Sequence, residues 1–261
     1  MKVHSLYLYP VKSLAGISVN SFDLDDFGPV GDRRWMIVDA VQKFVTQRSN
    51  PELAQVGTRL EGADVLVDIP GEGEFCLLPG TGSRNVRIWH DQVDAVAEAR
   101  NASEALSRFC QKNVYFVYMP EKVFRRIDPL KVPDYRRVSF ADGYPFLVTN
   151  TASLSELNGR LAAPVDMRRF RPNLVVEGAE PWSEDNWQAL VIKGISLSLV
   201  KPCSRCIMTT VNPDTGARSA DGQPLKTLAS YRRTPEGVIF GANGIHHGRG
   251  MLAVGDSATI V

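Results

Sequence analysis

Residues 189–216 read ALVIKGISLSLVKPCSRCIMTTVNPDTG, and the first half of this stretch decides the local fold. Apolar side chains recur at Leu190 and Ile192, and after Gly194 they alternate strictly through residues 195–199. Alternation with a period of two on both sides of a glycine predicts a β-hairpin with one buried face. The residues that follow therefore leave a well-specified strand and start from a rigid base.

Two cysteines follow this predicted strand, in the loop that leaves it. Cys203 and Cys206 lie close to Arg205, a fixed cation that favours the thiolate form of a neighbouring thiol. A structural zinc site needs four ligands from Cys and His. The remaining cysteines, Cys76 and Cys110, are distant in sequence, and the four histidines show no zinc-finger spacing. The pattern does not favour zinc.

Two other interpretations of the cysteine pair remain open from the residues alone. A thioredoxin-like redox pair would stand at the start of a helix, but residues 207–211 are rich in β-branched side chains and predict another strand. The pair could also pack as small apolar side chains, as most intracellular cysteines do. Thiolate is the form that binds soft metals, so a metal-binding role stands beside these two.

The composition describes a globular protein without a strong charge bias. The chain has 261 residues, 44% of them hydrophobic, and a net charge of +1. This balance gives no pull toward nucleic acid or membrane, so any basic patch must be local. Residues 1–10 alternate and end at Pro10, which predicts a strand and not a signal peptide. With no apolar run of about 18 residues, we expect no membrane span and a cytoplasmic protein.

Short alternating or β-branched runs recur along the whole chain, separated by turns that contain Gly and Pro, as in a barrel or sandwich. Few helices are predicted. One spans 102–112, a second spans 153–161 with Ser153 and Glu156 in the spacing of a capping box, and a short third begins at Pro224. Residues 120–137 show no period and predict a connection between two β-rich halves. The fold class is therefore mainly β with few short helices.

Motifs along nearly the entire chain resemble the MOSC domain family, and within it the branch of the mitochondrial amidoxime reducing component and its bacterial relatives that reduce N-hydroxylated compounds. The motifs that carry this resemblance are Tyr9–Ser13, Asp32–Trp35, Val45–Arg48, Ser139–Phe146, Phe170–Val176, Lys201–Gly216, Pro224–Leu228 and Val254–Asp256. The resemblance implies two β-barrel-like domains. A MOSC N-terminal domain would span residues 1–120, and a MOSC β-barrel would span residues 121–261.

The resemblance also implies a molybdenum cofactor, in which molybdenum is held by the dithiolene sulfurs of a phosphorylated pterin. By position, Cys206 would be the metal ligand and Cys203 a supporting residue. Asp142 would reach the metal as a proton donor. A phosphate monoester prefers Arg and Lys, with hydroxyl and amide groups beside them. The matching positions, expected to bind the cofactor, are Lys12, Ser13, Arg33, Arg171, Asn173, Ser204 and Arg205.

The implied function is reduction of small N-hydroxylated compounds, with electrons from a separate flavoprotein or ferredoxin-type reductase, because the chain ends after the predicted closing strand. The alternative is a protein that carries the molybdenum cofactor, or sulfur as a persulfide on Cys206, without turnover. Sulfur transfer in the family involves a second, pyridoxal-phosphate-dependent half, so a pyridoxal phosphate label here would be inherited from the family. A purely structural β-module is the last alternative.

Overall fold

The computed structural model describes all residues from Met1 to Val261. It contains nineteen strands and three α-helices, so the prediction of a mainly β protein with few short helices is confirmed. The strands form four sheets, and none of them is closed into a barrel. No helix is long and apolar enough to cross a membrane.

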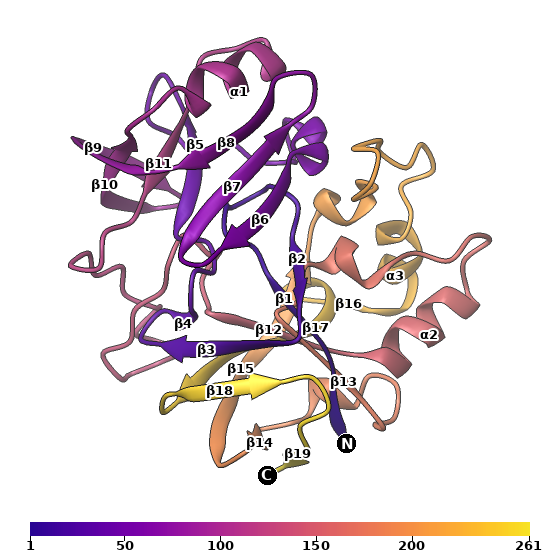
Figure 1. Ribbon diagram of the computed structural model, residues 1–261. Coiled ribbons are helices and arrows are strands. Elements are labelled where there is room, and N and C mark those ends of the chain that lie inside the picture. The colour runs from indigo at the N-terminus through magenta and orange to yellow at the C-terminus, as the bar shows by residue number, and fades with distance from the viewer.

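The largest sheet has nine strands and occupies the lower part of the molecule (Figure 1). Its pairs are antiparallel except for β12 and β13, which run parallel. The strand order is β19 (Ala258–Ile260), β14 (Ala189–Ile192), β15 (Ile195–Arg205), β17 (Gly237–His247), β12 (Phe146–Asn150), β13 (Leu174–Glu177), β1 (Lys2–Leu8) and β2 (Ile17–Val19), with β16 (Arg233–Thr234) on β17.

Three smaller sheets complete the fold, two of them in the upper part of Figure 1. The first contains β5 (Trp35–Asp39), β11 (Val114–Tyr118), β10 (Asp91–Glu98) and β9 (Pro79–Ile88) in that order. The second contains β6 (Gly57–Glu61), β7 (Asp64–Ile69) and β8 (Gly73–Leu77). The third, beside the large sheet, contains β18 (Gly250–Ala253), β3 (Ser21–Asp25) and β4 (Gly28–Pro29).

The first strand of the chain belongs to the same sheet as the last ones. β1 pairs with β13, and Val3 exchanges backbone hydrogen bonds with Gly255 and Asp256. The amide of Ala258 also donates to the carbonyl of Met1. Both termini therefore lie close together at the bottom of Figure 1. The predicted domain boundary near residue 120 stays a prediction. Strand β1, from the first half of the chain, pairs with β13 and so belongs to the sheet of the second half.

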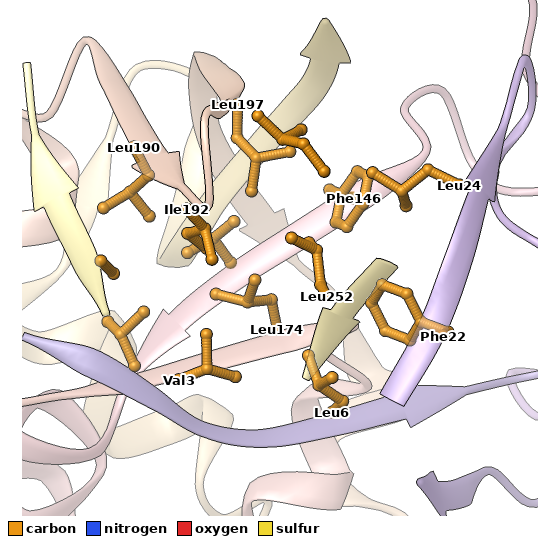
Figure 2. Close-up of a cluster of buried hydrophobic side chains, with 14 of the residues drawn as sticks. Val3, Leu6, Phe22, Leu24, Phe146, Leu174, Leu190, Ile192, Leu197 and Leu252 are labelled. Carbon is orange, nitrogen blue, oxygen red and sulfur yellow. The ribbon is translucent and has the colours of Figure 1, made fainter. Parts of the chain in front are cut away.

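The predicted hairpin at 189–200 is present as β14 and β15, which pair from Ile192 and Ile195 outward. Leu190, Ile192 and Leu197 are fully buried, as their alternation requires. They meet apolar side chains from β1, β3, β12, β13 and β18 in one core, which Figure 2 shows converging from all sides. The residues of this core lie at both ends of the sequence.

The helices are near their predicted places, although their ends differ. α1 spans Ala102–Cys110, α2 spans Thr151–Gly159 and α3 spans Leu225–Tyr231. The predicted capping box was wrong, because Asn150 caps α2 by accepting from the amide of Ala152. Ser153 lies inside the helix, where its hydroxyl donates to the buried Glu184. A carboxylate 31 residues away thus replaces the local partner.

One further expectation of local structure was wrong. Residues 207–211 do not form a strand, because Ile207–Thr210 are a 3-10 helix, η4, that follows Cys206. The hydroxyls of Thr209 and Thr210 donate back to the carbonyls of Cys206 and Ile207 and stabilise this turn. Strand β9 ends at Ile88, so that Trp89 lies in the turn between β9 and β10.

Replacing Leu6 by Ala tests whether β1 is an essential part of the large core. Leu6 is fully buried there (Figure 2), so the cavity left by truncation should cost about 2–5 kcal/mol of unfolding free energy. We expect a matching decrease in the urea midpoint. Val41→Ala, at a side chain that is 78% exposed, is the control and should stay within about 0.5 kcal/mol of wild type. Equal midpoints for Leu6→Ala and wild type would contradict this account of the core.

Candidate anion and cofactor site

One cavity collects all nine residues that the sequence predicts for the site. They come from five separate segments, which lie after β1, before β5, before β12, before β13 and at the end of β15. The predicted residues in its wall are Lys12, Ser13, Arg33, Asp142, Arg171, Asn173, Ser204, Arg205 and Cys206, and Cys203 lies with them. The structure thus brings together residues up to 194 positions apart, from Lys12 to Cys206. Their individual roles remain predictions.

Left-handed backbone marks three of these positions. The φ angles of Ser13, Arg33 and Arg171 are 72°, 51° and 57°. Residues with a Cβ rarely adopt such angles, and each costs on the order of 1–3 kcal/mol. Strain of this kind clusters at functional sites, where the surrounding structure holds it in place. Three of the eight non-glycine residues with positive φ lie in this wall, which supports a functional site at the cavity.

Two guanidinium groups in the cavity wall are held by one aromatic ring. The Cζ atoms of Arg33 and Arg171 lie 4.4 and 4.2 Å from the centroid of the Tyr9 ring. Cation–π attraction to Tyr9 offsets part of the repulsion between the two like charges. Arg171 is fixed further by the hydrogen bond that its Nη1 donates to the carbonyl of Leu14 at 2.6 Å. The orientation of both cations is thereby set before any ligand binds.

The buried carboxylate of Asp32 connects these elements, a role that sequence reasoning missed. Its Oδ1 accepts from the Tyr9 amide at 2.9 Å and from the Asn173 side chain at 3.0 Å, and its Oδ2 accepts from Arg33 Nη1 at 2.5 Å. Asp32 stood within a motif of the resemblance, but a local pattern does not reveal partners 141 residues away.

Asn173 lines the cavity, but its carboxamide is already engaged. Besides Asp32, the nitrogen donates to the carbonyl of Tyr7 at 3.3 Å, and the oxygen accepts from Arg33 Nη1 at 3.1 Å. Its predicted contact with a pterin is untested. The hydrogen bonds present favour a different task, in which Asn173 orients Arg33 and joins the end of β1 to the start of β13.

Lys12 and Asp142 form an ion pair inside the cavity, with Nζ and Oδ1 2.5 Å apart. Burial lowers the pKa of Lys12 to about 8, and Asp142 opposes this decrease. Partial desolvation raises the pKa of Asp142, but the Lys12 ammonium outweighs this effect and holds the pKa well below its usual range. Both groups are therefore charged at pH 7, and Asp142 is a carboxylate when nothing else binds Lys12.

The cysteine segment is shaped by two irregularities in β15. The pairing of β15 with β17 shifts between Leu199 and Lys201 and again between Pro202 and Ser204. Bulges redirect side chains and are frequent beside active sites, and they also accommodate Pro202 within a strand. Cys203 was expected in the loop after the strand. It lies instead within β15.

Arg205 contacts the first cysteine and not the second. Its Nη1 lies 2.9 Å from Cys203 Sγ, and its Nη2 donates to the carbonyl of Phe170 at 2.6 Å. Cys206 is exposed at the start of η4. The cation near the cysteine pair thus holds Cys203 in place, and the thiol of Cys206 is the one accessible to a ligand in the cavity.

The charges of the cavity wall fit an anion. Six cationic side chains line it against a single carboxylate, Asp142, although the whole chain has a net charge of only +1. Arg171 Nη2 and Arg205 Nε are buried without a hydrogen-bond partner. Burial and the proximity of Arg33 lower the pKa of Arg171 to about 10. An anion in the cavity would supply the missing acceptors and relieve this repulsion.

The same wall contains residues that sequence reasoning did not select. Arg48 is among them, although it lies in a motif of the resemblance, and Arg169 is another. The structure contains no group of three or more His, Cys, Asp or Glu side chains that could hold a metal by themselves. A metal here would need further ligands, such as the sulfurs of a cofactor. His246 and His247, adjacent on β17, bond Asp25 and Ser198 respectively and form no metal pair.

The fold and the cavity define a β-rich protein with a cationic cavity and an exposed thiol in its wall. Residues 135–259 match the MOSC domain and residues 1–113 match the MOSC N-terminal beta barrel domain. The human mitochondrial amidoxime-reducing component 1 is 32% identical over 97% of this chain and 81% of that protein. The chain belongs to the MOSC domain family and resembles its amidoxime reducing components.

Other relatives agree with this assignment. The rat mitochondrial amidoxime reducing component 2 is 34% identical over 88% of this chain and 72% of that protein. The molybdenum cofactor sulfurase of Oryza sativa is 31% identical over 91% of this chain but only 31% of that protein. Among solved structures, the YUAD protein from Bacillus subtilis aligns over 98% of this chain with 12% identity and a TM-score of 0.43, which is too low to support an argument.

Sulfate titration at two pH values tests the cationic cavity, because sulfate remains a dianion throughout the range. Lys12 loses its charge as pH rises through about 8, so affinity should fall between pH 7 and pH 9. With a pKa of about 8, the protonated fraction of Lys12 falls about 10-fold between these pH values, so the apparent Kd should weaken by at most about 10-fold. Calorimetry of Lys12→Arg, which stays charged, should show no such decrease. Equal wild-type affinity at both pH values would remove Lys12 from the anion site.

Proposed function

We propose that this chain is a molybdenum-cofactor-dependent oxidoreductase that reduces N-hydroxylated compounds, with electrons from a separate donor protein. The observation that carries the proposal is the convergence of the nine predicted residues in one strained, cationic cavity. The names of the relatives, amidoxime reducing component and molybdenum cofactor sulfurase, support the cofactor and the substrate class. The word "component" in the names of these relatives also fits a protein that works with a partner.

The residues of the cavity fit the cofactor that the family implies. The unpartnered Arg171 Nη2 and Arg205 Nε, together with Lys12 and Arg33, would bind its phosphate. The hydroxyls of Ser13 and Ser204 lie in the same wall and would complete the contacts. Cys206 would supply a thiolate, a ligand suited to a metal already bound to sulfur. When bound, the cofactor supplies the two-electron chemistry, and the protein orients the substrate.

The reaction consumes two electrons and two protons for each N–O bond broken, and yields N–H and water. Asp142 faces the cavity and is the nearest carboxyl that could hold one of these protons. Lys12 keeps it ionised in the free protein. A bound phosphate would compete for Lys12 and weaken this ion pair, so the pKa of Asp142 would rise. Its predicted role as a proton donor therefore depends on prior binding of an anion.

The alternative is a carrier of the cofactor or of sulfur, which would use the same cavity without turnover. Similarity to molybdenum cofactor sulfurase and the exposed thiol of Cys206 favour keeping this alternative. Turnover with an artificial electron donor separates the two. A protein that retains molybdenum but reduces no N-hydroxylated compound would be a carrier.

Arg171→Ala and Arg205→Ala test the phosphate contacts. Each substitution removes a cation from the cavity, so retention of the cofactor should weaken by about 1.5–3 kcal/mol. Molybdenum content after purification from a cofactor-competent host is the measurement. Arg59→Ala is the matched control, since Arg59 is exposed and pairs with Glu74 far from the cavity. Wild-type molybdenum content in both cavity variants would mean that these arginines do not hold the cofactor.

Cys206→Ser and Cys203→Ser distinguish the two cysteines. A hydroxyl cannot replace a metal-bound thiolate without changing the metal, so Cys206→Ser should abolish reduction of an N-hydroxylated substrate and alter the paramagnetic signal of pentavalent molybdenum. Cys203→Ser loses only its contact with Arg205 and should cost roughly 10- to 100-fold at most. Full activity in Cys206→Ser, or loss confined to Cys203→Ser, would reverse the assignment.

A further inference from the structure

Arg125 is a buried cation in a stretch that the sequence predicts to be only a connection. It lies within residues 120–137 and is 6% exposed. Its neighbour Arg126 is exposed, and the Nη2 of Arg126 donates to the carbonyl of Pro133 at 3.3 Å. Taking a guanidinium out of water is costly unless its donors are paired. The partners of Arg125 therefore indicate what its burial achieves.

The guanidinium of Arg125 binds one irregular segment of backbone beside the cavity. Nη1 donates to the carbonyls of Ser139 and Ala141 at 2.8 and 2.6 Å, and Nη2 donates to the carbonyl of Asp142 at 3.3 Å. These three residues belong to no strand or helix, and no backbone amide donates to their carbonyls. Arg125 thus supplies the hydrogen bonds that regular secondary structure would otherwise provide.

The other side of the guanidinium is anchored on a strand of the first half of the chain. Its Nε donates to Oδ2 of Asp91, the first residue of β10, at 2.7 Å. The carbonyl of Arg125 also accepts from the amide of Val138 at 2.9 Å. A planar guanidinium presents donors in a fixed fork, whereas the ammonium of a lysine is a single point. Lysine at this position could not reach the acceptors on both sides.

The segment that Arg125 holds carries Asp142, whose Oδ1 lies 2.5 Å from Lys12 Nζ. Gly143 follows, a residue with wide backbone freedom, and a Cβ at this position would meet no atom within 4 Å. The chain on that side of Asp142 therefore has little to hold it. Arg125 bonds the backbone and not the carboxylate, so its hold does not depend on the ion pair. Asp142 keeps its place even when an anion in the cavity binds Lys12.

We propose that Arg125 is a positioning residue that fixes the backbone of residues 139–142 and thereby holds the carboxylate of Asp142 against Lys12 in the cavity. Arg125 does not itself line the cavity, so it acts only through these neighbours. Its effect on turnover rests on the proposed function, in which Asp142 holds a proton for the reaction. Its effect on Lys12 does not, and can be measured in the full chain without cofactor.

Arg125→Lys keeps the positive charge and removes the fork, so it tests position separately from charge. Among the charges that act on Lys12, Asp142 raises its pKa, whereas Arg125 and Arg33 lower it. If the carboxylate moves away in Arg125→Lys, the pKa of Lys12 should fall from about 8 by about one unit. Carbon-13 NMR of lysine labelled at Cε, assigned with Lys12→Arg, is the measurement. An unchanged pKa of Lys12 in folded Arg125→Lys would overturn the proposal.

Asp142→Asn is the reference, because it removes the carboxylate without touching the segment that holds it. It should lower the pKa of Lys12 at least as far as Arg125→Lys. The double variant should show little further decrease, since the contact with one carboxylate can be lost only once. Additive shifts would mean that Arg125 acts on Lys12 by another route, against the proposal. Arg126→Lys, at the exposed neighbour, is the control and should keep the wild-type pKa of Lys12.

A urea transition shows whether Arg125→Lys is folded. If it is not, Asp91→Ala carries the test, because it removes the anchor of Nε at a side chain that is 46% exposed. The pKa of Lys12 should then fall in Asp91→Ala, and an unchanged value would equally overturn the proposal.

Turnover provides the second measurement. In the molybdenum-loaded protein, Arg125→Lys should lower kcat for benzamidoxime by about 10- to 100-fold with little change in KM, because a small misplacement of a reacting group is costly. Wild-type kcat in this variant would overturn the positioning role in the reaction. If the wild type reduces no amidoxime while Arg125→Lys lowers the pKa of Lys12, the proposed function fails and the positioning of Asp142 stands.

Discussion

The buried carboxylate of Asp32 is the interaction on which the site depends most. It is 3% exposed and accepts hydrogen bonds from the end of β1, from Asn173 before β13 and from its neighbour Arg33. Removing one partner of a buried ion pair typically costs about 3–5 kcal/mol, because the other charge remains without compensation. Here the loss would also release Arg33, Tyr9 and through them Arg171. One carboxylate therefore fixes both the sheet and the cations that face the cavity.

Like charges lie close together in the cavity, and the folded structure must offset their repulsion. Arg33 and Arg171 face the same ring, and Lys12 lies close enough to both Arg33 and Arg125 for their charges to lower its pKa. Left-handed backbone at three positions adds conformational strain. Such a site is complementary to something that the free protein lacks, namely negative charge. Binding of an anion should stabilise the whole fold and not only occupy a surface, because its binding free energy adds to that of folding.

Much of the fold could be predicted from the sequence because its signals are local. The alternation at 190–199 required a hairpin, and the apolar stripe of 102–110 required a helix. Residues 207–210 form a 3-10 helix although their β-branched side chains favour a strand. The hydroxyls of Thr209 and Thr210 donate to backbone carbonyls and stabilise this helix after Cys206. The pairing of β1 with β13 could not be predicted either, because strand pairing between positions 168 to 175 residues apart leaves no mark in either segment.

The residues of the site also fall into those that local sequence predicts and those that only the structure reveals. Its predicted members came from a resemblance of motifs, and the structure assembled them in one cavity. Asp32 was missed because its importance lies in a partner far along the chain, Asn173. A residue whose partners are remote looks ordinary within its own window of sequence.

The interleaving of β1 with the last strands has a consequence for the order of events in a cell. Residues 2–8 leave the ribosome well before their partners, because β13 begins only at Leu174 and the segment around Gly255 follows later still. Until then β1 lacks the strand β13 with which it pairs. Lys12 and Arg33 likewise lack the other residues that form the cavity wall. Folding of the large sheet must wait for contacts of long sequence separation, which is intrinsically slow. A ligand can therefore be loaded at this cavity only after β15 and β17, which supply part of its wall, have been made.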